Sequence, residues 1–224
     1  MKKIIFSILA IPVSGILIII VNYIIWENVA SLISEGKPIV QKDTVKTALL
    51  VIDVQEGITG RLAEYDYYIS KSGELISNIN LITDSSVSNN IPVIYVKNEI
   101  TNFLLNIINS SLAKGSTGAE LDSRLKIVSD IIINKDKGDA FTNPLLDTIL
   151  IKKDINKLVF VGLDLANCVK STVLGAVNRN YKICLISDGL LAKSDSLKNI
   201  TLDEFKKSGF EILSSDEYFK SLHK

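Results

Sequence analysis

The stretch "KLVFVGLDLANCVKSTVLGAVNRNYKICLIS" (157–187) contains two short apolar runs that flank a segment with helical spacing. The runs "KLVFVGL" (157–163) and "YKICLIS" (181–187) are apolar at most successive positions, which is typical of strands covered on both faces, as in a parallel sheet. Between them, apolar residues recur at the spacing of one helix face: Val169, Val173, Ala176 and Val177. This stretch therefore predicts a strand–helix–strand unit with parallel strands.

The same alternation continues on both sides of this unit. Four more runs share its apolar, β-branched character: "TALLVIDV" (47–54), "PVIYV" (92–96), "DIIIN" (130–134) and "FEILS" (210–214). Helical stripes lie between the runs, and Thr201 with Glu204 has the spacing of a capping box, which predicts a helix start there. The pattern predicts a three-layer αβα domain over 47–224 with a mostly parallel, Rossmann-like sheet of about six strands.

The first residues have a different character. "MKKIIFSILAIPVSGILIIIVNYIIWENV" has no charge between Lys3 and Glu27. As a helix, residues 4–25 would be roughly 33 Å long, enough to cross a bilayer core. We therefore predict one transmembrane helix, a retained anchor over 1–26, followed by a polar linker over 27–46. A cleaved signal peptide is the alternative, although the apolar run is longer than usual for one.

The charges beside the apolar run predict its orientation. Lys2 and Lys3 precede the run, while Glu27 and Glu35 are the first charges after it. The tendency of positive residues to stay in the cytoplasm places the N-terminus inside. The expectation is a single-pass membrane protein with an extracytoplasmic domain.

Composition excludes several classes of function. The 25 basic and 25 acidic residues cancel, so no large positive field favours nucleic acid. Two cysteines exclude a disulfide scaffold. The single histidine, His223, is the penultimate residue, which excludes a Ser-His-Asp triad, a Cys-His pair and most zinc sites unless this tail residue takes part.

Polar residues follow several of the predicted strands. In an open parallel sheet, ligands bind beyond the carboxyl ends of the strands. The residues at these ends are Asp53 and Gln55, Lys97 to Glu99, Lys135, Asp164 with Cys168, and Ser187 with Asp188. An acid, an amine and a thiol are thus predicted to meet at one edge of the sheet.

These three groups could act together in nucleophilic catalysis. A free thiol has a pKa near 8.5 and is mostly protonated at neutral pH. The N-terminus of a helix and the charge of Lys135 would both lower the pKa of Cys168. Asp53 could take the thiol proton and return it to a leaving amine. Singly, each residue has an ordinary structural explanation, and Cys184, inside an apolar strand, is expected to be a core residue.

The order of these blocks resembles the isochorismatase-like cysteine hydrolases. The resemblance rests on "TALLVIDVQEGI" (47–58), "INKDKGDAF" (133–141) and the block from Val161 to Gly189, and it covers about residues 46–222. It implies that Asp53 is the catalytic acid, Cys168 the nucleophile and Lys135 the lysine, with Lys137 as the rival for the last role.

The resemblance also implies the backbone of the site. The family carries a non-proline cis peptide four residues before its cysteine, here between Leu163 and Asp164. Its oxyanion hole would be formed by the backbone N–H groups of Asp164 and Cys168. Gln55, Asn98 and Phe141 are the candidate pocket residues.

One departure from the family affects the expected chemistry. Nicotinamidases of the family bind a metal through histidines after the second strand, whereas "YVKNEI" (95–100) has none. We therefore expect no metal and no cofactor. The intact set of Asp53, Lys135 and Cys168 indicates hydrolysis of a C–N bond in a small amide or carbamoyl substrate through a cysteine thioester. Vinyl-ether hydrolysis of the isochorismatase type and a non-catalytic, membrane-displayed binding domain are the alternatives. The sequence leaves open whether the protein forms a homo-oligomer in which a neighbouring subunit supplies part of the pocket wall.

Overall fold

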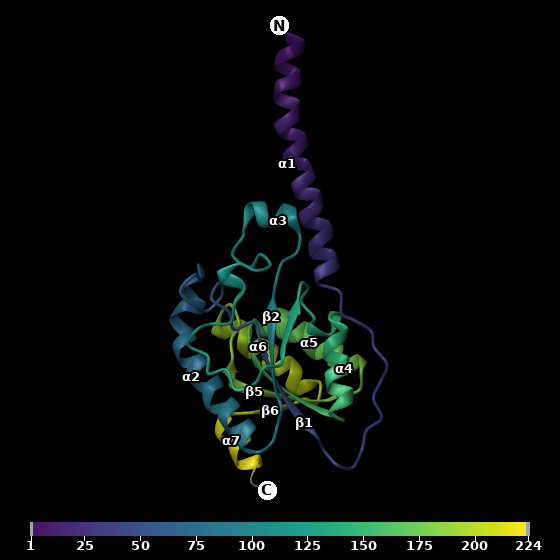
Figure 1. The fold of residues 1–224 in the computed structure, drawn as a ribbon, viewed down its shortest axis with the longest axis vertical. Helices are drawn as coiled ribbons and strands as arrows, with labels where there is room; N and C mark the ends of the chain where they lie inside the picture. The colour runs from purple at the N-terminus through teal and green to yellow at the C-terminus, as the bar shows by residue number, and fades with distance from the viewer. Residues whose placement is uncertain (1, 223–224) are drawn as a thin grey trace.

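A six-stranded parallel sheet forms the centre of the molecule (Figure 1). The computed structural model describes the backbone over residues 2–222 and the side chains over 15–222. The strand order is β3-β2-β1-β4-β5-β6, and every pairing is parallel. The strands are β1 (Thr47–Ile52), β2 (Val93–Asn98), β3 (Ile132–Lys135), β4 (Lys157–Gly162), β5 (Lys182–Leu190) and β6 (Glu211–Leu213).

Helices cover both faces of the sheet, which gives the three layers predicted from the sequence. On one face lie α2 (Asp66–Ser88) and α7 (Ser215–Ser221); on the other lie α4 (Pro144–Lys152), α5 (Lys170–Asn178) and α6 (Asp195–Lys207) (Figure 1). The central strands β1 and β4 are buried along nearly their whole length, because each has an apolar side chain pointing into each layer. Two apolar clusters, one per face, form the core.

Short helical turns connect the larger elements on the carboxyl side of the sheet. They are α3 (Phe103–Ile108), η1 (Thr117–Ala119), η2 (Ala140–Thr142) and η3 (Leu165–Val169). The last is a single π-helical turn that leads directly into α5. α6 begins after its N-cap Ser194, so the predicted start at Thr201 is wrong. Thr201 lies inside the helix and donates to the Leu197 carbonyl four residues back.

The predicted transmembrane helix is the part of the fold that must be corrected. The first helix, α1 (Lys2–Ala30), exists, but in the described part of the chain no helix is long and apolar enough to cross a membrane. A span needs about 20 consecutive apolar residues. Over residues 15–30 the apolar character of α1 is interrupted by Asn22 and ends at Glu27 and Asn28. This finding contradicts the single-pass anchor, the membrane localisation and the extracytoplasmic placement of the domain.

The segment after α1 runs back along the outer side of α4 to reach β1 (Figure 1). The backbone N–H of Ser34 donates to Asp139 Oδ2 at 2.9 Å, and the N–H of Ile39 donates to the Arg179 carbonyl at 2.9 Å. Residues 31–46 therefore lie against the domain and are held there by hydrogen bonds.

Candidate active site

Asp53 and Lys135 form a buried ion pair at the carboxyl edge of the sheet. Asp53 directly follows β1, in a left-handed backbone conformation with φ of 53°, and Lys135 is the last residue of β3. Lys135 Nζ lies 2.8 Å from Asp53 Oδ2, with side-chain exposures of 0% and 4%. Burial alone would lower the pKa of Lys135, but the Asp53 carboxylate and Cys168 raise it above its ordinary value. The lysine is therefore charged at neutral pH.

Cys168 lies in η3, at the start of the helical segment that follows β4. Cys168 is partly buried as a whole residue, whereas Cys184 is fully buried in β5. Burial raises the pKa of the Cys168 thiol to about 12; Lys135 lowers it, but the Asp53 carboxylate opposes Lys135. The sequence predicts a lowered pKa, and the reason for the difference is that burial outweighs the lysine. The resting group is thus a neutral thiol that interacts with both members of the ion pair.

The backbone between β4 and Cys168 is tightly constrained. The peptide bond between Leu163 and Asp164 is cis. Gly162 has a φ of 111°, and a Cβ there would lie 2.1 Å from the Ile52 carbonyl oxygen, so only glycine fits. The Asp164 carboxylate accepts from the Ala166 N–H at 2.7 Å and from the Tyr68 hydroxyl. These contacts fix the turn that presents Cys168.

The candidate pocket residues have different environments. Gln55 donates to the carbonyls of Asn98 and Ala119 and accepts from the Asn98 N–H, so it joins the ends of β1 and β2 to η1. Phe141 is buried in the core, where it stacks on Tyr181 at 6.0 Å between ring centroids. Asn98 is the member of the three that lines a cavity with Cys168.

This cavity has a volume of about 250 Å³ and Cys168 is one of its lining residues. It is lined by Trp26, Glu27, Ala30, Ser31, Asn98, Asp136, Lys137, Gly138, Asn167, Cys168 and Ser171. Lys137, the rival lysine, thus lies on its wall, whereas Lys135 is in the ion pair and lines a neighbouring cavity of about 310 Å³ with Glu99 and Asp136. A larger hollow of about 890 Å³ lies at the amino ends of the strands, but it contains neither cysteine and none of the predicted site residues.

The end of β2 carries a second buried charge pair. Lys97 Nζ lies 3.5 Å from Glu99 Oε1 and 3.0 Å from Glu120 Oε2, and Asn134 donates to Glu99 at 3.2 Å. Within residues 15–222, no three histidine, cysteine or acidic side chains are grouped in a way that could hold a metal ion.

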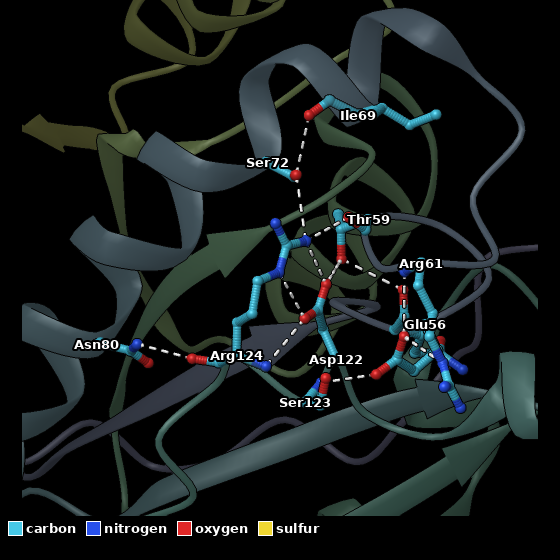
Figure 2. Close-up of polar contacts among 10 residues, drawn as sticks. Glu56, Thr59, Arg61, Ile69, Ser72, Asn80, Asp122, Ser123 and Arg124 are labelled. Carbon is cyan, nitrogen blue, oxygen red and sulfur yellow. Dashed lines mark hydrogen bonds and ion pairs between the residues drawn. The ribbon is translucent and has the colours of Figure 1, made fainter.

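The loop that follows Asp53 is fastened by a polar network (Figure 2). Asp122 is buried and accepts from Thr59 Oγ1 at 2.8 Å and from Arg124 Nε at 2.9 Å. Glu56 accepts from the N–H groups of Arg61 and Ser123 at 3.1 and 3.0 Å. Burial raises the pKa values of Asp122 and Glu56, but these hydrogen bonds outweigh it and hold both pKa values below the ordinary range.

Sequence reasoning missed this network. Asp122 and Arg124 lie in an irregular segment without helical or strand periodicity, so no pattern pairs them with Thr59 or Glu56. The network joins the loop of residues 56–61 to residues 122–124 and thereby fixes the chain that leaves Asp53.

The comparisons with known proteins agree with this architecture. The family model of the Isochorismatase domain matches residues 47–217. Ureidoacrylate amidohydrolase RutB of Acinetobacter baylyi is 32% identical over 155 residues, which are 57% of this chain and 63% of that enzyme, so the chain spans less than two thirds of this relative. A probable inactive nicotinamidase of Arabidopsis thaliana is 27% identical over 79% of this chain and 96% of its own length.

A solved structure extends the comparison to three dimensions. N-carbamoylsarcosine amidase from Thermoplasma acidophilum superposes with a TM-score of 0.65 and 27% identity, over 77% of this chain and 98% of that one. The predicted family is thereby confirmed. The chain belongs to the isochorismatase family of hydrolases.

Proposed function

We propose that this protein hydrolyses the C–N bond of a small amide or carbamoyl substrate, with Cys168 as the nucleophile. The observation that carries the proposal is the meeting of three groups at the carboxyl edge of the sheet. The Cys168 thiol interacts with Asp53 and Lys135, which form an ion pair of 2.8 Å, and Cys168 itself lines the cavity. A nucleophile, a base and a fixed positive charge are the minimum set for acyl transfer.

The protonated state of the Cys168 thiol indicates which proton is transferred first. Because burial raises the pKa of Cys168 to about 12, the thiol must lose its proton as it attacks. Asp53 Oδ2 is engaged by Lys135, whereas the buried Asp53 Oδ1 has no hydrogen-bond partner within the described chain. Oδ1 is therefore the acceptor for the Sγ proton. Lys135 stabilises the negative charge that develops on sulfur and on the substrate oxygen.

The remaining steps follow from this assignment. Sγ bonds to the substrate carbonyl carbon, and the oxyanion is stabilised by the backbone N–H groups of Asp164 and Cys168 at the start of the helical segment. Asp53 returns the proton to the departing nitrogen, the C–N bond breaks, and a thioester remains on Cys168. Water, deprotonated by the freed Asp53 carboxylate, then cleaves the thioester and restores the thiol.

The relatives support a C–N bond as the target. Two are named as an amidohydrolase and an amidase, for ureidoacrylate and N-carbamoylsarcosine. Isochorismatase-type vinyl-ether cleavage needs no covalent sulfur intermediate, so the assembled thiol, acid and lysine favour the amidase reaction. A domain that only binds would have no use for a buried charged pair beside a thiol, since such a pair costs desolvation energy.

The experiment that tests the function is a screen for ammonia release from a panel of small amides and ureido acids. With a substrate in hand, rapid acid quenching and mass spectrometry should show the acyl group on the peptide that contains Cys168. Cys168→Ala should lower kcat at least about a thousandfold, whereas the matched control Cys184→Ala keeps turnover. A Cys168→Ala variant with near-full activity would end the thiol mechanism, and pyruvate release would indicate the vinyl-ether reaction instead.

A further inference from the structure

The outer wall of the Cys168 cavity is built by residues that precede the family domain. Trp26, Glu27, Ala30 and Ser31 line the cavity, whereas the family match begins at residue 47. The N–H of Gly138, a lining residue from the domain, donates to the Ala30 carbonyl at 2.9 Å. The C-terminal end of α1 is thus in direct contact with the catalytic edge of the domain.

Polar contacts hold this wall on both sides. Before it, Asn102 donates to Asn22 Oδ1 at 2.9 Å. After it, Ser34 Oγ donates to Asp139 Oδ2 at 2.6 Å, and Arg179 Nη1 donates to Ser34 Oγ at 3.0 Å. Asp139 and Arg179 are buried, and buried charges need hydrogen-bond partners. Because the segment supplies some of these partners, it is a structural part of the cavity wall.

The positive and negative charges on the cavity wall do not cancel. Asp136 and Lys137 are neighbours of opposite sign and largely cancel, and Asp136 also accepts from Thr101 at 3.1 Å. Glu27 is the remaining charge, and it takes part in none of the ion pairs found over residues 15–222. The helix end beside it carries partial negative charge, and the face of an indole ring such as that of Trp26 attracts cations.

The lining residues from α1 and those from the domain therefore differ in polarity. Among the domain residues, Cys168 lies near the start of a helical segment, where negative charge is stabilised. Among the residues of α1, Glu27, Trp26 and the C-terminal end of the helix favour positive charge. The volume of about 250 Å³ restricts the occupant to a small molecule.

We propose that Trp26 and Glu27 are specificity-determining residues, and that they make the cavity select small amides that carry a positively charged group besides the scissile carbonyl. This inference rests on the proposed hydrolase function for the scissile bond. The polarity of the wall itself is independent of turnover, and the test separates the two.

The test measures how fast Cys168 reacts with methanethiosulfonates of different charge. The full chain carries Cys184→Ala, so that Cys168 is the remaining thiol. The probes are the trimethylammonium-ethyl, sulfonatoethyl and methyl reagents, and the readout is the ratio of the cationic to the anionic rate constant. Glu27→Gln should lower this ratio about fivefold, because one nearby negative charge is lost. Glu35→Gln is the matched control, since Glu35 lies on the same segment but outside the cavity lining, and it should leave the ratio unchanged.

A second variant tests the shape of the wall. Trp26→Ala should speed the reaction of a bulky neutral probe, benzyl methanethiosulfonate, by about threefold relative to the methyl reagent, because the indole no longer narrows the cavity. Tyr23→Ala is the control, since Tyr23 is on α1 but outside the cavity lining. Circular dichroism of each variant verifies that the helices are retained.

The outcomes separate this proposal from the proposed function. A ratio that Glu27→Gln leaves unchanged, or that Glu35→Gln lowers equally, overturns the selectivity of the wall. With turnover, the kcat/KM preference for glycinamide, an amide with an ammonium group, over acetamide should fall in Glu27→Gln by a similar factor. The expected labelling ratios without hydrolysis of any amide would support the wall and count against the hydrolase function.

Discussion

Lys135 Nζ lies 2.8 Å from Asp53 Oδ2 although the strands that carry these residues are not neighbours in the sheet. The lysine reaches across the carboxyl end of β2 to meet the residue after β1. Both side chains are almost fully buried, so each is the compensating charge of the other.

This ion pair predicts that a variant lacking both charges regains stability without regaining activity. Lys135→Met should destabilise the protein by about 3–5 kcal/mol, because it leaves the Asp53 charge buried without its partner. The double variant Asp53→Asn with Lys135→Met should recover most of that stability but no activity. Urea unfolding checks the first effect and substrate turnover the second. A double variant as unstable as the single one would show that the two charges are not coupled.

The pKa of Cys168 predicts how its reactivity depends on pH. With a pKa raised by burial to about 12, the thiolate fraction rises about tenfold for each pH unit throughout the neutral and mildly alkaline range. The rate of alkylation by iodoacetamide should therefore increase between about pH 7 and pH 10 without a plateau. Peptide mapping should find Cys168 labelled well before Cys184, because Cys184 is only 1% exposed inside β5. A plateau near neutral pH would mean that Lys135 and the helix outweigh burial.

The network around Asp122 predicts an effect on acid stability (Figure 2). The pKa of this carboxyl is below its ordinary range in the folded protein, so its stabilisation is fully present above about pH 4, the unfolded pKa, and is lost as the pH falls through the folded pKa. Asp122→Asn should cost about 2 kcal/mol near pH 7, and the difference from the unchanged protein should shrink below about pH 4.

Urea unfolding at several pH values measures this difference. Asp43→Asn is the matched control, because Asp43 is exposed and its loss should have no effect at either pH. An Asp122→Asn penalty that stays constant into the acid range would mean that the hydrogen bonds, rather than the charge, supply the stabilisation.

The sequence predicts the domain better than it predicts what surrounds the site. Apolar runs such as those of β1 and β4 are local signals, and they predict both the strands and the residues at their carboxyl ends. Asp53, Lys135 and Cys168 meet because parallel strands end at one edge. Phe141 faces the core instead of a pocket, because the turn that carries it packs under Tyr181, and no local pattern reveals that contact.

The N-terminal segment illustrates the other limit. Its composition is typical of a membrane span. The prediction from the sequence therefore gives the apolar run more weight than the polar residues that follow it. Ser34 and Glu27 have no periodicity that would place one against Asp139 and the other in a cavity. Such contacts between distant parts of a chain depend on tertiary packing, which a single sequence does not display.

The last prediction concerns the anchoring of this segment by Arg179. The guanidinium donates to Asp147 Oδ1 at 2.7 Å and to the carbonyls of Ser34 and Glu35 at 3.2 and 3.0 Å. Arg179→Lys keeps the charge but loses the planar set of donors, so it cannot hold Asp147 and the segment together. Hydrogen exchange of the amides of residues 31–39 should become about tenfold faster, while exchange in β1 and β4 stays unchanged. Lys152→Arg, at the exposed end of α4, is the control and should not alter exchange. Unchanged protection of residues 31–39 in Arg179→Lys would show that the backbone contacts of Ile39 and Ala30 hold the segment without the guanidinium.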